Sequence, residues 1–302
     1  GIENLTGARD NEDTFVFCGG SLSGTVEGGA GGFDSLVIEG GPFNTVSYLY
    51  TGLDSGIIDL DGTTITYSGM EPIVDNTVAG TRTITFANGG QTLIISDDGV
   101  ANDKSQINPI PWELLALLNP TDNLIVNADN GGVGHDIITV KALDDDFNAA
   151  FTVNAGAGDD QITFDGTADV NGIAGPDPIT DAATVNGNAG NDTYVFKDHW
   201  GDVTINEGSG EGADTIMFVG YSGTLGFSWD TVNLIITGSD NDVAHPEKLT
   251  ITLDVLPNIE SMTKDGIELL DFSPGVIKNA IVGGLKDLAE GLRSLAQYDA
   301  FG

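Results

Sequence analysis

The stretch that decides the fold is LIVNADNGGVGHDIITV, residues 124–140. A short apolar strand runs into a turn of Asp, Asn and Gly, and a second apolar strand follows directly after Asp136. The same unit recurs as FTVNAGAGDDQITF (151–164), ATVNGNAGNDTYVF (183–196) and VTINEGSGEGADTIMF (203–218). Self-similarity of this kind is typical of repeat folds, in which neighbouring units stack to bury one continuous core.

The copies can be aligned on the aspartate that ends each turn. Looser copies at 5–17 and 25–38 and an echo at 234–245 extend the series, whose members are Asp13, Asp34, Asp136, Asp160, Asp192, Asp214 and Asp242. Most successive aspartates are separated by twenty-odd residues, which suits one coil of a β-solenoid. The coils of such a fold stack about 4.8 Å apart. We therefore predict an all-β chain, mainly a right-handed parallel β-solenoid (β-helix or β-roll-like), with an irregular N-terminal half and a C-terminal amphipathic helix.

Four segments are expected. They are 1–42, N-terminal coils with degenerate repeats; 43–120, an irregular β region; 121–272, the solenoid with ion-binding turns; and 273–302, a capping or linker helix. In the second segment, Asn88-Gly89-Gly90 between two strand-like runs (81–86 and 91–96) is a hairpin signal. Prolines bracket 109–120, and we favour a two-turn helix there over a buried strand. Apolar residues at helical spacing from 276 to 298 predict the terminal helix.

Composition excludes several classes of partner. The 302 residues carry 46 acidic and 10 basic side chains, a formal net charge of −36, which leaves no basic footprint for nucleic acid or for an anionic membrane surface. No run approaches the roughly 18 apolar residues of a membrane-spanning helix, and we expect no membrane insertion. The one cysteine, Cys18, cannot form a disulfide within the chain. We see no signal peptide, and the start at Gly1 leads us to expect a processed chain or an excised fragment.

The same composition favours a folded protein whose turns bind cations. A chain that is 40% hydrophobic with thirteen Phe can bury a core, unlike a disordered acidic chain. Of the acidic residues 34 are Asp, which belongs in turns and hard-cation sites, and only 12 are the helix-forming Glu. Ions bound in fixed sites would relieve the self-repulsion of so acidic a chain.

The turns match a known nonapeptide. Residues 131–139, GGVGHDIIT, are a full copy of G-G-x-G-x-D-x-U-x, in which U is a large apolar residue; 187–195 lacks only the second Gly and 155–163 only the first. The sequence therefore resembles the hemolysin-type calcium-binding repeat (repeats-in-toxin) family. It looks most like the repeat regions of very large secreted or surface-attached bacterial proteins, and this implies a secreted or cell-surface location.

The resemblance also implies calcium ions held between adjacent turns by the sixth-position aspartate and turn carbonyls. That role falls on Asp136, Asp160, Asp192 and Asp214, more weakly on Asp34 and Asp13, with Asp159 and the turn glycines Gly131, Gly134, Gly158 and Gly190. In the standard β-roll of that family the motif occurs twice per coil and the ions lie in two rows. Here the motif occurs about once per coil, so we expect one row of sites. The alternative is a row of plain turns, in which Asp satisfies the backbone without a metal. For Asp144–Asp146 and Asp97–Asp98 we favour solvated acidic loops over further ligands.

Three classes of function remain. We expect a non-enzymatic calcium-binding segment, monomeric as isolated, acting as a structural spacer or an adhesion module whose folding is linked to calcium. An adhesion module would contact glycans or a cell surface. Trp112, Trp200 and Trp229 are candidate stacking residues, although isolated aromatics of this kind more often belong to the core or its rim. The alternative is a polysaccharide-active β-helix enzyme, a lyase or epimerase. Its best local constellation is Lys197-Asp198-His199-Trp200, which we interpret as a surface loop.

Overall fold

The computed structural model describes residues 3–100, 102–144, 146–166, 183–206, 211–229, 233–239, 247–252 and 259–271. Every regular element among these residues is a β-strand, which confirms the all-β prediction. The part of the chain described contains no helix long and apolar enough to cross a membrane. The predicted terminal helix at 276–298 and the echo at Asp242 lie outside the described residues.

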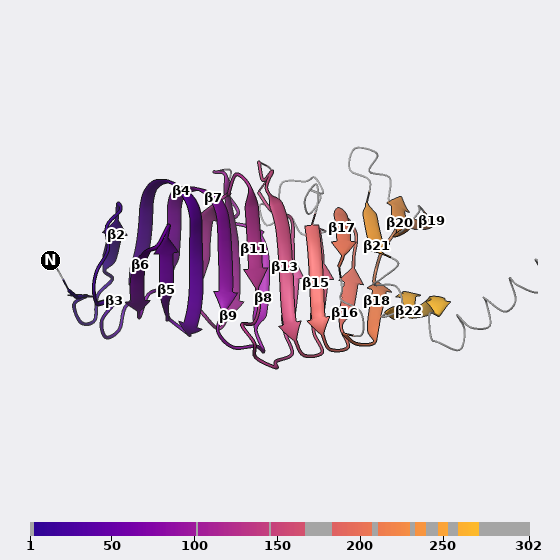
Figure 1. Cartoon of the computed structure of the whole chain (residues 1–302), viewed down its shortest axis with the longest axis horizontal. Coiled ribbons are helices and arrows are strands. Elements are labelled where there is room, and N and C mark those ends of the chain that lie inside the picture. Colours follow the sequence, from indigo (N-terminus) through magenta and orange to yellow (C-terminus); the bar gives the residue numbers. More distant parts are fainter. Residues whose placement is uncertain are drawn as a thin grey trace, which may run out of the picture.

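The strands form one mixed sheet that folds into two faces, which we call face A and face B (Figure 1). Face A runs, in spatial order, β1 (Leu5–Thr6), β3 (Thr25–Glu27), β6 (Thr63–Ser68), β5 (Ser55–Leu60), β4 (Ser35–Gly52), β7 (Ile73–Phe86), β11 (Asn123–Asn127), β13 (Ala150–Ala157), β15 (Ala183–Ala189), β17 (Asp202–Ile205), β21 (Lys248–Thr252), β20 (Asn233–Ser239) and β19 (Thr224–Trp229).

Face B runs beside it and shares β4 and β7, which are long enough to pass from one face to the other. Its order is β2 (Thr14–Phe17), β4, β7, β10 (Leu115–Leu118), β9 (Lys104–Ile110), β8 (Thr92–Asp97), β12 (Ile137–Val140), β14 (Gln161–Phe164), β16 (Thr193–Phe196), β18 (Asp214–Phe218), β22 (Ile259–Lys264) and β23 (Ile267–Asp271). From β7 to β21 on face A, and from β8 through β12 to β22 on face B, neighbouring strands are parallel.

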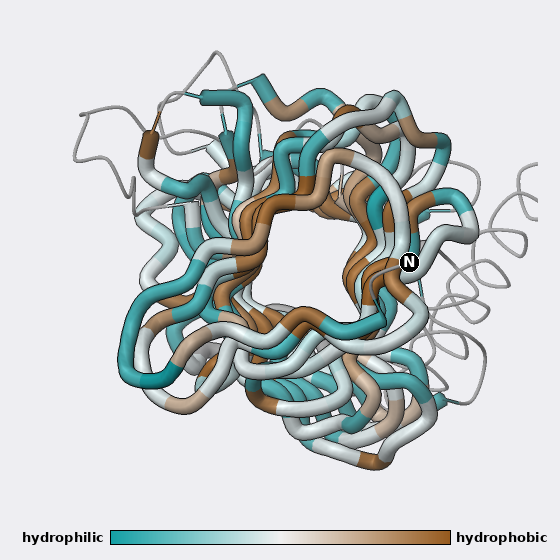
Figure 2. Tube along the Cα trace, turned by 90° about the vertical axis from the view of Figure 1, so that its left-hand side faces the viewer, coloured by the Kyte–Doolittle hydropathy of each residue, from teal (hydrophilic) through white to brown (hydrophobic). Residues whose placement is uncertain are grey.

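The core lies between the two faces because alternate strand residues point inward. Viewed along the long axis, successive turns of the chain superpose around an apolar interior (Figure 2). One cluster of buried side chains runs from Val26 to Met262. Because the register is kept from strand to strand, like side chains stack: the Phe164 and Phe196 rings lie 5.4 Å apart, and Phe218 follows at 5.5 Å.

The irregular segment 43–120 adds antiparallel strands between the parallel ones. β5 and β6 extend face A, while β9 and β10 stand between β7 and β8 on face B. The predicted hairpin across Asn88–Gly90 is therefore wrong, since β7 pairs with β4 and β11, and β8 pairs with β9 and β12. This Asn-Gly-Gly turn instead carries the chain from face A to face B.

The predicted two-turn helix at 109–120 is also wrong. Residues Leu115–Leu118 form β10, in which Leu115 and Leu117 are fully buried and alternate with half-buried neighbours. β10 pairs with β7 on one side and β9 on the other. These long-range hydrogen bonds give the apolar run a strand geometry, although its flanking prolines suit a short helix equally well.

A buried ion pair joins the two halves of β7. Asp75 lies in the half that belongs to face B and Arg82 in the half that belongs to face A, and both are fully buried. The Arg82 guanidinium contacts the Asp75 carboxylate, and its Nε donates to the carbonyl oxygen of Leu118 at 2.8 Å. Tyr48 Oη donates to Asp75 Oδ2 at 2.6 Å. The network fixes the bend at which the strand changes face.

Candidate functional site

The Gly/Asp turns lie along one edge of the molecule, where each face A strand passes to its face B strand. The turns before β12, β14, β16 and β18 follow β11, β13, β15 and β17 respectively. Both sets of strands are parallel and in register, so these turns stack on one another. The four best repeats are thus adjacent to one another in the fold.

The turn aspartates form an inner row of buried carboxylates. The backbone N–H of Asp136 donates to Oδ1 of Asp160 at 2.7 Å, and that of Asp160 donates to Oδ1 of Asp192 at 2.8 Å. The N–H of Asp192 donates to Oδ1 of Asp214 at 2.9 Å. All four residues are at most 2% exposed. One oxygen of each carboxylate after the first thus holds the preceding turn in place.

The second oxygen of these carboxylates has a different environment. Within the described part of the chain, Oδ2 of Asp136, Asp160 and Asp192 is buried and accepts no hydrogen bond. A buried carboxylate oxygen without a donor costs free energy, of the order of 1–3 kcal/mol or more for a charged group. A bound proton or a cation would compensate the negative charge on these atoms.

The pKa values of the row are consistent with carboxylates that are buried and short of hydrogen-bond donors. Burial raises the pKa of Asp136 to about 7, and the nearby carboxylates of Asp160 and Asp129 add to the rise. Burial likewise raises the pKa of Asp192 to about 7, with Asp160 and Asp214 contributing. The pKa of Asp160 is raised as well, chiefly by burial. Hydrogen bonds from the backbone partly oppose these shifts but do not cancel them.

A row of glycines runs alongside the aspartates, made of Gly134, Gly158, Gly190 and Gly212. A Cβ on each of the last three would overlap the carbonyl oxygen of the glycine before it. Gly158 (φ 149°) and Gly190 (φ 154°) also adopt backbone angles that favour glycine. The carbonyls of Gly134, Gly158 and Gly190 therefore point along the row towards the next turn.

An outer row, one residue before the aspartates, is exposed and makes its own contacts. Oδ1 of Asp159 accepts the backbone N–H of Asn191 at 2.8 Å, and Oδ1 of Asn191 accepts that of Ala213 at 3.1 Å. Asp159 is thus placed beside the inner row rather than in it. Gly131, at φ 87°, lies at an open part of its turn, with no atom within 4 Å of where a Cβ would stand.

The two N-terminal candidates form a separate pair. The N–H of Asp13 donates to Oδ1 of buried Asp34 at 2.8 Å. Both oxygens of Asp13 already accept hydrogen bonds, from Ala8 and Asn11. On face B, four strands (β7, β10, β9 and β8) separate β4, which follows Asp34, from β12, which follows Asp136. The N-terminal pair and the row of four are therefore separated, at the 102-residue step in which the sequence lacks the full motif.

Two residues that the sequence did not single out belong to the site. Gln91 occupies the place before Asp136, and its backbone N–H donates to Asp136 Oδ1. Asp129, two residues before the nonapeptide, accepts the N–H of Gly131 at 2.7 Å and that of Ala157 at 3.1 Å. Because Asp129 lies outside the repeat motif, alignment of the motif could not identify it. It nevertheless connects two turns, and its charge raises the pKa of Asp136 and of Asp160.

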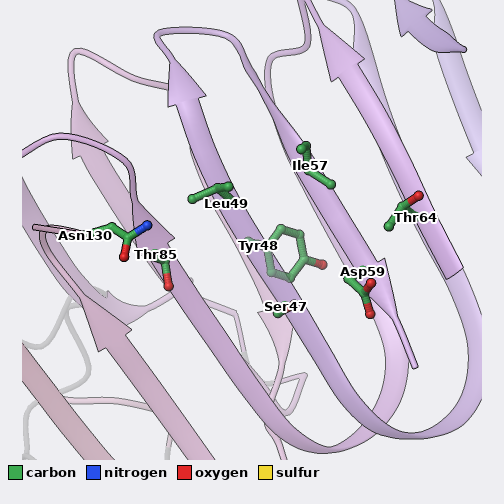
Figure 3. Close-up of a pocket in the computed structure, with 8 residues that line it drawn as sticks. All are labelled: Ser47, Tyr48, Leu49, Ile57, Asp59, Thr64, Thr85 and Asn130. Carbon is green, nitrogen blue, oxygen red and sulfur yellow. The ribbon is translucent and has the colours of Figure 1, made fainter. Parts of the chain in front are cut away.

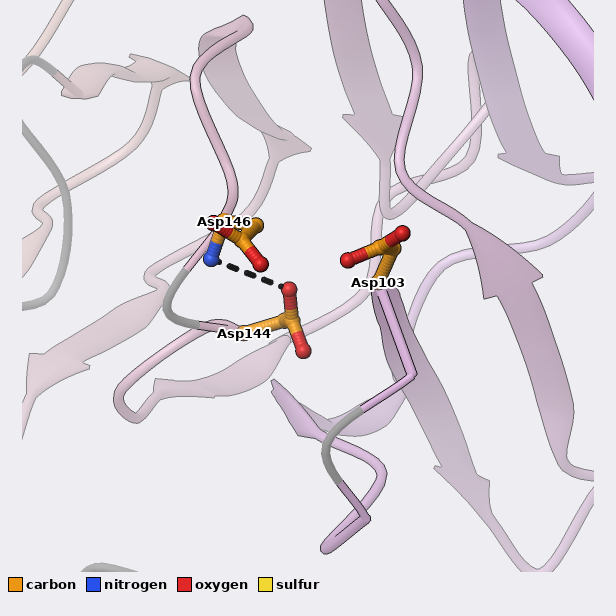
Figure 4. Close-up of side chains that lie close together, drawn as sticks. All are labelled: Asp103, Asp144 and Asp146. Atoms are coloured by element: carbon orange, nitrogen blue, oxygen red, sulfur yellow. Dashed lines mark hydrogen bonds between the residues drawn. The ribbon is translucent and has the colours of Figure 1, made fainter.

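A second acidic group lies elsewhere in the fold. Among the described residues, Asp103, Asp144 and Asp146 are the one set of three or more acidic, His or Cys side chains whose ligand atoms all lie within 4.8 Å of one another (Figure 4). Asp144 is only 7% exposed, contrary to the solvated loop expected there, and burial raises its pKa. Its Oδ1 accepts hydrogen bonds from Asn119 Nδ2 at 2.9 Å and from the Asp146 N–H at 3.1 Å. These bonds account for the burial of Asp144 without a metal ion.

The constellation 197–200 is used in structural contacts. Lys197 Nζ pairs with Asp165 at 2.8 Å, and Asp198 Oδ1 accepts the N–H of Ser222 at 2.8 Å. Trp200 is fully buried against Phe196 and Tyr221. The side chain proposed for sugar stacking at this place is thus part of the core.

Comparison with protein-family models and with the sequences of curated proteins finds no match to this chain.

Proposed function

We propose that this chain is a calcium-binding β-solenoid segment of a large secreted or cell-surface bacterial protein, and that it acts as a non-enzymatic structural spacer. The two ladders of parallel strands are interpreted as the successive coils of a right-handed solenoid. The turns that join them are interpreted as ion sites, so that folding is linked to calcium.

The observation that carries the proposal is the row of buried carboxylate oxygens that no donor satisfies. Oδ2 of Asp136, Asp160 and Asp192 recurs at the same place in successive turns. A turn that needed its aspartate only for the backbone would use Oδ1 alone, as Asn does, and would gain nothing from a second, buried, charged oxygen. A row of such oxygens favours a ligand that supplies positive charge.

The chemistry of the donors fits calcium. Ca²⁺ takes about six to eight oxygen ligands from carboxylates, carbonyls and water in flexible geometry, whereas Mg²⁺ requires near-ideal octahedral geometry and keeps its water. The row offers the carboxylates of Asp136, Asp160, Asp192 and Asp214 and the carbonyls of the stacked glycines. The carboxylates stand in single file, so an ion there would draw on carbonyls as well. Bound ions would also reduce the repulsion within a chain of net charge −36.

Calcium titration by calorimetry tests this function. We expect saturable binding of more than one Ca²⁺ by the wild-type chain, and a lower number of sites in Asp160→Asn and Asp192→Asn. Asp54→Asn, which removes one exposed charge between β4 and β5 and outside the Gly/Asp repeats, is the matched control and should keep the wild-type stoichiometry. Binding that is unchanged in both row variants would show that these turns are not ion sites.

A further inference from the structure

Face A carries two outward rows of uncharged side chains, all of them polar except Ile125. The first, which we call the threonine row, contains Thr83, Ile125, Thr152, Thr184 and Thr204, which are paired in register across β7, β11, β13, β15 and β17. The second, the asparagine row, lies two residues further along the same strands and contains Thr85, Asn127, Asn154, Asn186 and Asn206. None of the ten is charged, in a chain with 46 acidic side chains.

Hydrogen bonds hold the asparagine row in a fixed orientation. Asn127 Nδ2 donates to Thr85 Oγ1 at 3.0 Å, and Asn154 Nδ2 donates to Asn127 Oδ1 at 2.7 Å. The row continues through Asn186 to Asn206, whose Nδ2 donates to Asn186 Oδ1 at 3.0 Å. A primary amide has two N–H donors, so one on each of these asparagines remains for a ligand. The row is thus an ordered line of donors that needs no side-chain reordering on binding.

A cavity of about 360 Å³ lies at one end of the two rows (Figure 3). Ser47 on β4 pairs with Thr83, and Leu49 pairs with Thr85, so the cavity floor continues both rows. Beyond them, β5 contributes Ile57 and Asp59, and Tyr48, Thr64 and Asn130 complete the lining. Cavity and rows therefore form one track along face A.

The lining has the mixed chemistry of a small-molecule site. Leu49 and Ile57 offer apolar surface, while the Asp59 carboxylate is an acceptor. In the described part of the chain, the side chains of Ser47, Thr64 and Asn130 make no hydrogen bond to the protein. Hydroxyl, amide and carboxylate groups beside the apolar side chains of Leu49 and Ile57 suit the hydroxyl groups and C–H faces of a sugar.

We propose that face A binds an uncharged polysaccharide, with one sugar in the cavity and the following sugars along the threonine and asparagine rows. An extended ligand is favoured because the polar groups repeat about every 4.8 Å along the track, so weak contacts add up along a polymer. An uncharged one is favoured because the rows hold no cation to pair with a polyanion and the whole chain is strongly negative. This goes beyond the calcium proposal because the track lies on the outer surface of face A; since Asn130 lies in the turn between Asp129 and Gly131, the variants below leave it unchanged.

Affinity electrophoresis in native gels tests the proposal, with calcium in every gel. The probes are four neutral polymers (dextran, galactomannan, mixed-linkage β-glucan and hydroxyethyl cellulose) and one polyanion, alginate. We expect retardation by at least one neutral polymer and none by alginate. Ser47→Glu in the cavity and Thr152→Glu or Thr184→Glu on the threonine row should each weaken that retardation at least about ten-fold. Thr139→Glu is the matched control, because Thr139 is also half-buried but projects from face B.

The melting temperature of each variant is measured first, so that loss of binding can be distinguished from loss of fold. No retardation by any neutral polymer, retardation by alginate alone, or equal retardation of wild type and track variants would overturn the proposal. Calcium binding is read separately by calorimetry, so failure here leaves the calcium proposal standing, and the reverse holds too.

Discussion

The backbone N–H of Asp160 donates to Oδ1 of Asp192 in the next turn, at 2.8 Å, while Oδ2 of Asp192 is buried with no donor in the described part of the chain. One carboxylate therefore has two separable roles. Oδ1 aligns the preceding turn, and Oδ2 supplies a negative charge to the row. Substitutions that keep one role and remove the other distinguish a structural turn from an ion site.

The first prediction concerns Asp160→Asn. Asn keeps an oxygen that can accept the Asp136 N–H, now 2.7 Å from Asp160 Oδ1, but it loses the buried charge. In chelator at pH 8 the melting temperature should stay the same or rise, because an uncompensated carboxylate has been removed. In excess calcium it should fall by several degrees, because the ion loses a ligand. Thermal unfolding followed by circular dichroism measures both.

Asp160→Ala is the companion variant. It loses the hydrogen bond from Asp136 as well as the charge, so it should be less stable than Asp160→Asn with or without calcium, by about 1 kcal/mol. If Asp160→Asn lowered the melting temperature equally in calcium and in chelator, the charge of Asp160 would have no role in ion binding.

The second prediction concerns the glycine row. Gly158→Ala should destabilise the chain strongly, by more than about 2 kcal/mol, because its Cβ would overlap the carbonyl oxygen of Gly134 and the backbone angle is unfavourable. Gly131→Ala shares an unfavourable backbone angle but meets no neighbouring atom, so its cost should be about 1 kcal/mol. Urea unfolding compares the two, and equal losses would mean that the turns do not stack as closely as described.

The third prediction is a pH dependence in the absence of calcium. The pKa of Asp136 and of Asp192 is raised to about 7, and burial raises the pKa of Glu113 to about 8. Below the unfolded-state values near 4, both states hold these protons. Between about pH 4 and pH 8 the unfolded chain releases them first, so the free energy of unfolding falls as the pH rises. The melting temperature in chelator should therefore decline from pH 5 to pH 8.

Variants separate the sources of that decline. Asp136→Asn and Glu113→Gln should each flatten it, since each removes one group that titrates differently in the two states. Asp10→Asn removes an exposed charge and controls for general repulsion. With calcium bound, the row should stay ionised and the decline should be smaller. A melting temperature in chelator that rises between pH 5 and pH 8 would refute this electrostatic picture of the row.

The fourth prediction concerns the bend in β7. Arg82→Met leaves the Asp75 carboxylate buried without its cation and should cost about 3–5 kcal/mol. The double variant Arg82→Met with Asp75→Asn removes that lone charge and should recover part of the loss. Urea unfolding of these two variants and of Asp75→Asn alone gives the coupling between the residues. A double variant no more stable than the single one would show that the ion pair is not what holds the bend.

Much of the site was predictable because its signal is local. The strand, the Gly-rich turn and the aspartate lie within one repeat, and alignment of the repeats placed Asp136, Asp160, Asp192 and Asp214 in order. Parallel pairing at constant register then brings equivalent residues together. The separation between Asp34 and Asp136 is also visible in the sequence, as a long gap without the motif.

The rest depended on pairing between distant segments. Asn88-Gly89-Gly90 has the sequence of a tight hairpin turn, but which strands pair is decided by β4 and β11, far away in the chain. Asp103 and Asp144 are brought close together only by the fold, and no sequence pattern near either residue predicts their contact. The aromatic residue Trp200 was proposed for a surface and is buried, because strand alternation does not reveal how a loop side chain turns.

The most direct test of the calcium account is thermal unfolding of the wild-type chain by circular dichroism in excess calcium, in excess magnesium and in chelator, at pH 7.5. The account predicts a melting temperature that is at least about 10 °C higher in calcium than in chelator, with little rise in magnesium. Equal melting temperatures in calcium and chelator would contradict it, and the buried row would then have to be satisfied by protons alone.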